Sequence, residues 1–325
     1  MIVIESNDGV VLNRDCVIVD IVARMTSGSS ITISMNNEGP CLEALGVYSL
    51  LDMLCDRFSY PKQDICIKTN NLLETHKEYN IVKSPTQDYF NSAKKHADQH
   101  PTTKIFNEQT KHFGHFIGHG NYHRLRLASY LFSHHQDKAI QSYHYKQLDD
   151  YHRSFVGLED MLYFNHSWQN IEAACNLLKH APLTVDTVES YPILNPATLN
   201  ITKVYPSFFV ELCSLTYFSG NTFRMDEKIC RPIIANTPFM IQGPQNYIKN
   251  LRRAGFKTFY QWWDEGYSED PSDCQVEPII DNINRLAKLS IAELSAMYND
   301  MQPTLEHNRN LLLDLTEQTL TEIFK

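Results

Sequence analysis

The sequence predicts an α/β protein with two Rossmann-like domains and a helical C-terminal tail. Three observations lead to this prediction: a βαβ pattern near the N-terminus, a second run of alternating strand and helix patterns further on, and a length of 325 residues, more than one compact core usually holds. We place an N-terminal domain at 1–107, a second domain at 108–275 and the tail at 276–325.

The first βαβ unit carries the N-terminal domain. Ser30–Met35 is rich in β-forming residues and is followed by the turn Asn36–Pro40. Apolar residues then recur at helical spacing over Leu42–Phe58, and Ile65–Lys68 has the composition of the next strand. The polar stretch 84–110 has no such pattern, so we expect a surface helix and a linker there.

The second domain repeats the alternation of strands and helices. We expect strands at Phe113–Gly118, Ser207–Leu212 and Pro238–Gln242, and helices at His123–His134, 226–235 and Gln245–Ala254. Pro244 suits the first position of the last of these helices, and Gly255 suits the position after its end. The tail is predicted to be helical from Val276 and again over Leu311–Phe324.

The cysteine usage and the lack of a membrane span indicate an intracellular, cytoplasmic protein. No apolar run approaches a membrane span, and the eight cysteines are scattered without a Cys-x-x-Cys pair, as is typical of reduced thiols.

The net charge of −9 is unevenly distributed along the sequence: 224–257 carries +5 and 111–153 carries +3. Two basic islands in an acidic chain favour a local anionic ligand and disfavour nucleic acid.

The histidines of the second domain resemble a metal site only at first sight. His112, His115, His119 and His123 are interrupted by glycines, so they cannot share one helical face. On a strand, His112 and His115 point to opposite faces. Zinc requires convergent ligands, so we expect no metal site and no cofactor.

A candidate anion site lies at the predicted helix start near residue 226. There the chain places Arg224, Asp226, Glu227, Lys228 and Arg231 within eight residues. A helix N-terminus carries unpaired N–H groups and partial positive charge, and the added cations favour a phosphate or diphosphate.

A second candidate lies after the strand at Phe113–Gly118. Asn121 stands in a glycine-containing loop, and Arg124 and Arg126 follow at the start of a helix. A solvated charged face is the alternative for the two arginines. The loop-then-helix context favours an anion site.

These two motifs resemble those of α-1,3-fucosyltransferase-like glycosyltransferases, most closely over 207–260. In that family a Thr-Glu-Lys triplet opens a helix that leads to a strand ending in glycine, as Asp226–Lys228 does here before Gly243. The stretch Phe116–Leu131 is similar to the family's strand, polar loop and helix with a leading arginine. The resemblance implies a GT-B-like arrangement with an N-terminal acceptor domain and a C-terminal nucleotide-sugar domain.

The resemblance also implies roles for single residues. Lys228 and Arg124 would hold the donor diphosphate, and Glu227 would bond a ribose or sugar hydroxyl. Asp226 replaces the family's threonine, and both residue types cap helices. The family keeps an acid shortly before the triplet, where this chain has Leu215-Thr216, so the sugar and the nucleotide stay open.

Transfer to a hydroxyl needs a general base, and we expect Glu38, in the turn after the first clear strand, to supply it. The alternative is that Glu38 is an ordinary loop carboxylate. The chain has no Asp-x-Asp, the usual motif for a diphosphate-bound metal, so the positive charge would come from side chains.

We therefore expect an inverting, metal-independent glycosyltransferase that takes a nucleoside-diphosphate sugar, with a GDP-sugar favoured and fucose as the implied sugar, and a carbohydrate or other hydroxyl acceptor. One alternative is a non-catalytic nucleotide- or glycan-binding protein on the same scaffold. Another is a phage or viral enzyme that glycosylates DNA bases, which the acidic total disfavours.

Overall fold

The computed structural model describes residues 2–3, 15–35, 39–84, 97, 104–118, 120–143, 157–164, 166–185 and 204–325. The predicted base Glu38 lies outside the described residues, as do residues 85–96 and 98–103 of the predicted surface helix and linker at 84–110. The α/β class is confirmed, because the strands of the described chain form parallel sheets that alternate with helices.

The chain divides into two compact units, each described here by itself. Unit 1 comprises 1–88, 216–226 and 315–325, and unit 2 comprises 89–215 and 227–314. The boundaries predicted after residues 107 and 275 both fall within unit 2, and the predicted domains stay a prediction.

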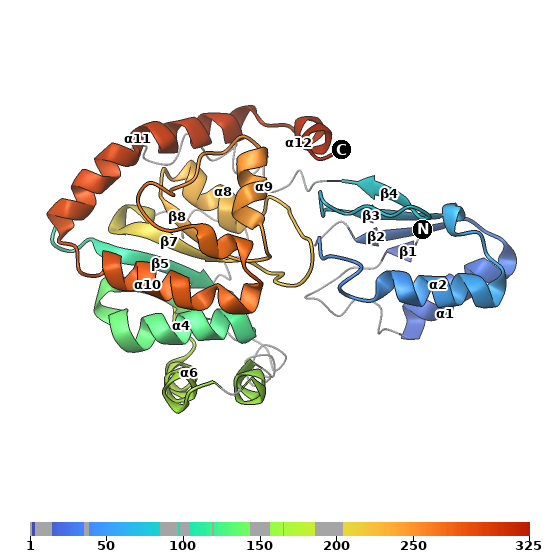
Figure 1. The fold of residues 1–325 in the computed structure, drawn as a ribbon, viewed down its shortest axis with the longest axis horizontal. Helices are drawn as coiled ribbons and strands as arrows, with labels where there is room; N and C mark the ends of the chain where they lie inside the picture. The colour runs from blue at the N-terminus through green and yellow to red at the C-terminus, as the bar shows by residue number, and fades with distance from the viewer. Residues whose placement is uncertain are drawn as a thin grey trace. The chain divides into compact units, whose positions relative to one another are not determined.

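Unit 1 is built on a four-stranded parallel sheet in the order β1-β2-β3-β4. The strands are β1 (Ile2–Val3), β2 (Ile31–Met35), β3 (Ile65–Thr69) and β4 (Asn80–Lys83). Helices α1 (Asp15–Ser27) and α2 (Val47–Phe58) lie on one face of this sheet (Figure 1). The isoleucines of β2 and β3 and the apolar face of α2 form its core.

The predicted helix over Leu42–Phe58 begins later than expected. Residues 42–46 form turns, and α2 begins at Val47, because Gly46 takes a left-handed conformation with φ of 68°. A helix cannot pass through such a residue, and glycine adopts it without steric cost. The strands predicted at Ser30–Met35 and Ile65–Lys68 are confirmed.

Unit 1 also includes two later segments. Asn71 holds the first of them: its Nδ2 donates to the carbonyl of Asn221 at 2.9 Å, and its Oδ1 accepts from Phe223 N at 3.0 Å. Helix α12 (Glu317–Ile323) belongs to the second, where Phe324 accepts a hydrogen bond from Lys83 Nζ at 2.8 Å and packs on the ring of Phe223.

Unit 2 holds a second parallel sheet in the order β6-β5-β7-β8. Its strands are β5 (Lys111–Ile117), β6 (Ala139–Tyr143), β7 (Phe208–Ser214) and β8 (Phe239–Gln242). Every residue of β7 is buried, since β7 has a strand on each side and helices on both faces. This explains why five of its seven residues are apolar, with Glu211 and Ser214 as the exceptions.

Helices cover both faces of this sheet (Figure 1). On one face lie α4 (Tyr122–His135) and α10 (Val276–Leu286), and on the other lie α8 (Glu227–Ile234) and α11 (Ile291–Asp314). Helix α6 (Trp168–His180) packs on α4 through the cluster that contains Leu125, Ala128 and Ala174. Residues 157–163 and α9 (Tyr247–Arg253) are also helical, and short 3-10 turns occur at Lys62–Asp64, Gln136–Lys138, Tyr205–Ser207, Gly266–Glu269 and Ser272–Cys274.

Two details of the C-terminal half differ from the prediction. Helix α9 begins after Asn246, which is left-handed, so Pro244 precedes the helix instead of opening it. The helix predicted at Leu311–Phe324 is divided between α11 and α12, and Thr316 caps the second through its side chain. None of the helices in the described ranges combines the length and the apolar composition that a membrane-spanning helix needs.

Candidate functional site

The sheet of unit 2 reverses its strand order between β5 and β7. From β5 the chain proceeds outward to β6, and from the adjacent β7 it proceeds outward to β8 on the other side. In open α/β sheets, ligands bind outside the carboxyl ends of the strands at such a reversal. We call this region the switch-point edge and define it by Asn121–Arg124, Cys213–Leu215, Glu227–Lys228 and Gln242–Gly243.

Helix α4 begins at this edge with a side-chain cap. Asn121 is extended, and its Oδ1 accepts a hydrogen bond from Arg124 N at 3.0 Å. Asparagine is among the preferred residues for this position because its side chain satisfies an otherwise unpaired N–H. The first turn of α4 therefore has a defined geometry, with its positive dipole end at the switch point.

Arg124 lies in that first turn and is anchored to the end of β7. Its Nε donates to the carbonyl of Leu215 at 3.0 Å, and the residue is only 5% exposed. Leu215 is held in turn, since its N–H donates to Gln242 O at 2.9 Å. Its side chain fills the space beside Gly243, where a Cβ would lie 2.6 Å from Leu215 Cδ1. Glycine at 243 therefore permits the placement of the carbonyl that orients Arg124.

Helix α8 brings a second cation to the same strand end. Cys213 Sγ donates to the carbonyl of Lys228 at 3.2 Å, which ties the first turn of α8 to β7. The Lys228 ammonium forms an ion pair with the carboxylate of Glu227, and the two side chains are 11% and 4% exposed. Arg124, through its Nε, and Lys228, through its backbone carbonyl, are thus each tied to the segment 213–215, where β7 ends.

A polar chain that the sequence did not reveal runs beneath the edge. His115 Nε2 lies 3.0 Å from Ser214 Oγ, which donates to Gln242 Oε1 at 2.7 Å, and Gln242 Nε2 donates to His123 O at 2.9 Å. Burial and the nearby charge of Arg124 lower the pKa of His115 to about 3, so its imidazole is neutral. The signal in the sequence is the position of Ser214 and Gln242, each a polar residue that ends a largely apolar strand.

Arg224 and Asp226 belong to unit 1, whereas Glu227, Lys228 and Arg231 of the same motif belong to unit 2. Arg224 Nη2 lies 3.6 Å from Asp226 Oδ2, and the two residues are 6% and 2% exposed. The structure thus brings these two predicted residues together. Helix α8 begins at Glu227, one residue later than predicted.

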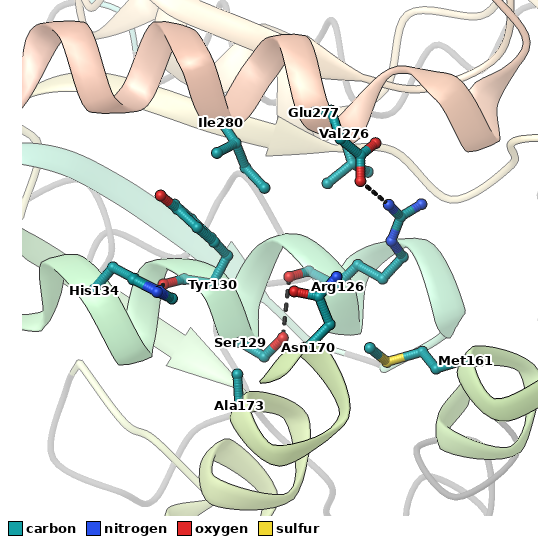
Figure 2. Close-up of a pocket in the computed structure, with 10 residues that line it drawn as sticks. All are labelled: Arg126, Ser129, Tyr130, His134, Met161, Asn170, Ala173, Val276, Glu277 and Ile280. Carbon is teal, nitrogen blue, oxygen red and sulfur yellow. Dashed lines mark hydrogen bonds and ion pairs between the residues drawn. The ribbon is translucent and has the colours of Figure 1, made fainter. Parts of the chain in front are cut away.

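Arg126 contacts helix α10. Its guanidinium reaches Glu277 of α10, and it lines a small pocket formed by α4, α6 and α10 together with Met161 (Figure 2). The cavity volume is about 20 Å³, which holds one or two water molecules and no nucleotide. Arg126 therefore joins α4 to α10 in this structure.

Arg231 faces the interior from the other side of the sheet. Its Nη2 lies 3.3 Å from Glu211 Oε1, and both side chains are at most 2% exposed. Tyr205 OH donates to the other oxygen of Glu211 at 2.6 Å. Burial raises the pKa of the Glu211 carboxyl, and the charge of Arg231 opposes that rise. Within unit 2, this arginine serves as the partner of a buried acid.

The histidines that were compared with a metal site have other contacts. His112 Nε2 lies 2.9 Å from Leu289 O, His115 belongs to the polar chain, and His119 lies outside the described residues. Among the side chains that the structure describes, no three His, Cys, Asp or Glu residues are grouped so that they could hold a metal ion.

Comparison with known proteins adds no assignment. No protein-family model, no curated protein and no solved structure matches this chain.

Proposed function

We propose that this protein is an inverting, metal-independent glycosyltransferase, and that the switch-point edge of unit 2 binds the diphosphate of its nucleoside-diphosphate sugar donor. The observation that carries the proposal is the attachment of two residues in helix first turns to the carboxyl end of β7: Arg124 is held through its side chain by Leu215, and Lys228 through its backbone carbonyl by Cys213.

Charge supports a diphosphate as the ligand. Two helix N-termini and two cations converge on one strand end, and such an arrangement stabilises the negative charge that develops on a leaving phosphate. The side chains are already oriented by protein contacts, so little reorganisation accompanies binding. The first turn of α4 is capped before any ligand arrives.

The finer parts of the proposal rest on the sequence resemblance. Both units are proposed to be Rossmann-like, with unit 1 binding a carbohydrate or other hydroxyl acceptor and Glu38 acting as the base. A GDP-sugar is the favoured donor and fucose the implied sugar. None of the cysteine side chains that the structure describes is in a disulfide, which supports a reducing compartment such as the cytoplasm.

The test is a calorimetric titration of the full-length protein with GDP, UDP, CDP and TDP, with EDTA present. One of the four is expected to bind with a clear preference. Lys228→Ala should weaken that binding by about tenfold to a hundredfold, the effect expected from the loss of one charge-assisted contact. EDTA should leave the affinity unchanged.

Lys249→Ala is the matched control, because Lys249 lies on α9 in the same basic stretch but is exposed and is not one of the residues that define the edge. It should leave binding unchanged. Equal, weak binding of all four nucleotides, or equal effects of Lys228→Ala and Lys249→Ala, would exclude the proposal.

A further inference from the structure

The polar chain beneath the switch-point edge connects three strands to the first turn of α4. It passes from His115 on β5 through Ser214 on β7 to Gln242 on β8, and it ends at the carbonyl of His123 on α4. His115 is 0% exposed and Gln242 is 1% exposed, so the chain is shielded from water. Arg124, which follows His123 directly, contacts the residue that follows Ser214.

The far end of this chain determines the direction of every hydrogen bond in it. A backbone carbonyl can only accept, so the Gln242 amide must turn its Nε2 toward His123 O. Its Oε1 then faces Ser214, whose hydroxyl must donate to it. A serine hydroxyl has one proton, so Ser214 Oγ can only accept from His115. His115 therefore carries its proton on Nε2.

The protonation state of His115 keeps this direction unchanged. Burial and the positive charge of Arg124 hold the pKa of the imidazole far below neutrality. An imidazolium would carry a second proton on the buried Nδ1, away from water, and would add a positive charge near that of Arg124, which is unfavourable. The neutral tautomer with Nε2–H is thus the form present over the physiological pH range.

We infer that His115 is a positioning residue of the diphosphate site: by donating to Ser214 it orients Gln242, and Gln242 holds the first turn of α4, where Arg124 lies. This inference rests on the proposed function, because it assigns a role in the binding of the same ligand. Without the Nε2 donor, Ser214 could rotate toward another acceptor and the Gln242 amide could flip. Two acceptor oxygens would then face each other at His123.

The tautomer can be measured independently of any ligand. In ¹⁵N-labelled full-length protein, the His115 side chain is expected to show a protonated Nε2 and an unprotonated Nδ1 by long-range ¹H–¹⁵N correlation, unchanged from pH 5 to pH 8. Ser214→Ala should change the His115 nitrogen shifts. A protonated Nδ1 would overturn the inference whether or not the protein binds nucleotides.

The positioning role is tested by affinity for GDP, or for whichever nucleoside diphosphate the wild type prefers. His115→Leu removes the donor and should weaken binding by about tenfold, the equivalent of one buried hydrogen bond. His115→Gln can place an amide N–H near the position of Nε2 and should stay within about threefold of the wild type. Ser214→Ala should act like His115→Leu and provides a second variant if that protein does not fold.

His134→Leu is the control, because His134 is exposed and lies near the end of α4, the helix whose first turn holds Arg124. This variant should leave the affinity unchanged. If the wild-type protein binds no nucleoside diphosphate, the proposed function is refuted. The tautomer measurement still tests the direction of the hydrogen bonds from His115 to His123. Wild-type protein that binds, with folded His115→Leu and Ser214→Ala variants of equal affinity, refutes the positioning role alone.

Discussion

Arg231 shows most directly how a residue's surroundings decide its role. In the sequence it is one of several cations near a helix start, whereas in the structure it contacts Glu211 in the interior of unit 2. Lys104 lies in the same region, where its Nζ donates to Phe208 O, and burial lowers its pKa well below the ordinary value. The buried acid Glu211 is thus accompanied by two basic side chains, Arg231 and Lys104. We therefore expect each of the two to affect the folding stability of unit 2.

Replacing Arg231 with Met should destabilise unit 2. The change removes the partner of Glu211 and leaves a buried carboxylate uncompensated, which typically costs about 3–5 kcal/mol. Urea denaturation measures the difference. The exposed Lys249→Met should change stability by less than about 0.5 kcal/mol. If Arg231→Met instead weakened nucleotide binding while stability stayed within about 1 kcal/mol of the wild type, Arg231 would be a ligand residue and not a structural one.

His115 should make the stability of unit 2 depend on pH below neutrality. Its pKa is about 3 in the folded chain against an ordinary 6.5, so between these values only the unfolded chain binds the proton. Stability is therefore complete above pH 6.5 and falls as the pH is lowered toward 3, by at most about 1.4 kcal/mol per pH unit. The charged group that faces the ring is Arg124.

The measurement is the free energy of unfolding from pH 7 to pH 4 for wild type and His115→Gln. Because glutamine does not titrate, the variant should lose less stability over this range. Parallel pH profiles for the two proteins would show that His115 does not contribute.

At the scale of the element, sequence patterns located most of the helices and strands of unit 2, because parallel strands buried on both faces are largely apolar and their helices are amphipathic. The patterns missed β6, α6 and the helical residues 157–163. In β6, three of the five residues are only half-buried, so its sequence lacks a continuous apolar run. The predicted helix ends were the least accurate part of the prediction. Gly46 and Asn246 adopt left-handed backbone, which the composition does not reveal, and helices α2 and α9 therefore begin only after them.

Gly114 is an element-scale constraint on β5. The strand lies between β6 and β7, and a Cβ at this position would lie 2.6 Å from two ring atoms of Phe208. Gly114→Ala should therefore destabilise unit 2 by about 1–3 kcal/mol through overpacking. Thermal unfolding measures it, and Gly266→Ala serves as the control, because that Cβ would meet only the end of the Asp264 side chain. Similar melting temperatures for the two variants would contradict this account.

At the scale of the whole molecule, the chain crosses between the units after residues 88, 215, 226 and 314. This path separates neighbours in the sequence: Asp226 is counted with unit 1 and Glu227 with unit 2. Asn71 stabilises the first excursion by bonding Asn221 and Phe223. A motif that looks continuous in the sequence is therefore divided between two packed bodies.

The sequence alone determined the α/β class, most strand positions and the two helix starts that carry Arg124 and Lys228, because these follow from local periodicity and capping residues. Only the tertiary structure decided which candidates share a site. It directed Arg126 to Glu277 and Arg231 to Glu211, and it linked His115, Ser214 and Gln242 across 127 residues of chain. Such contacts depend on strand order and on which face each helix covers, and local sequence patterns do not record either of these.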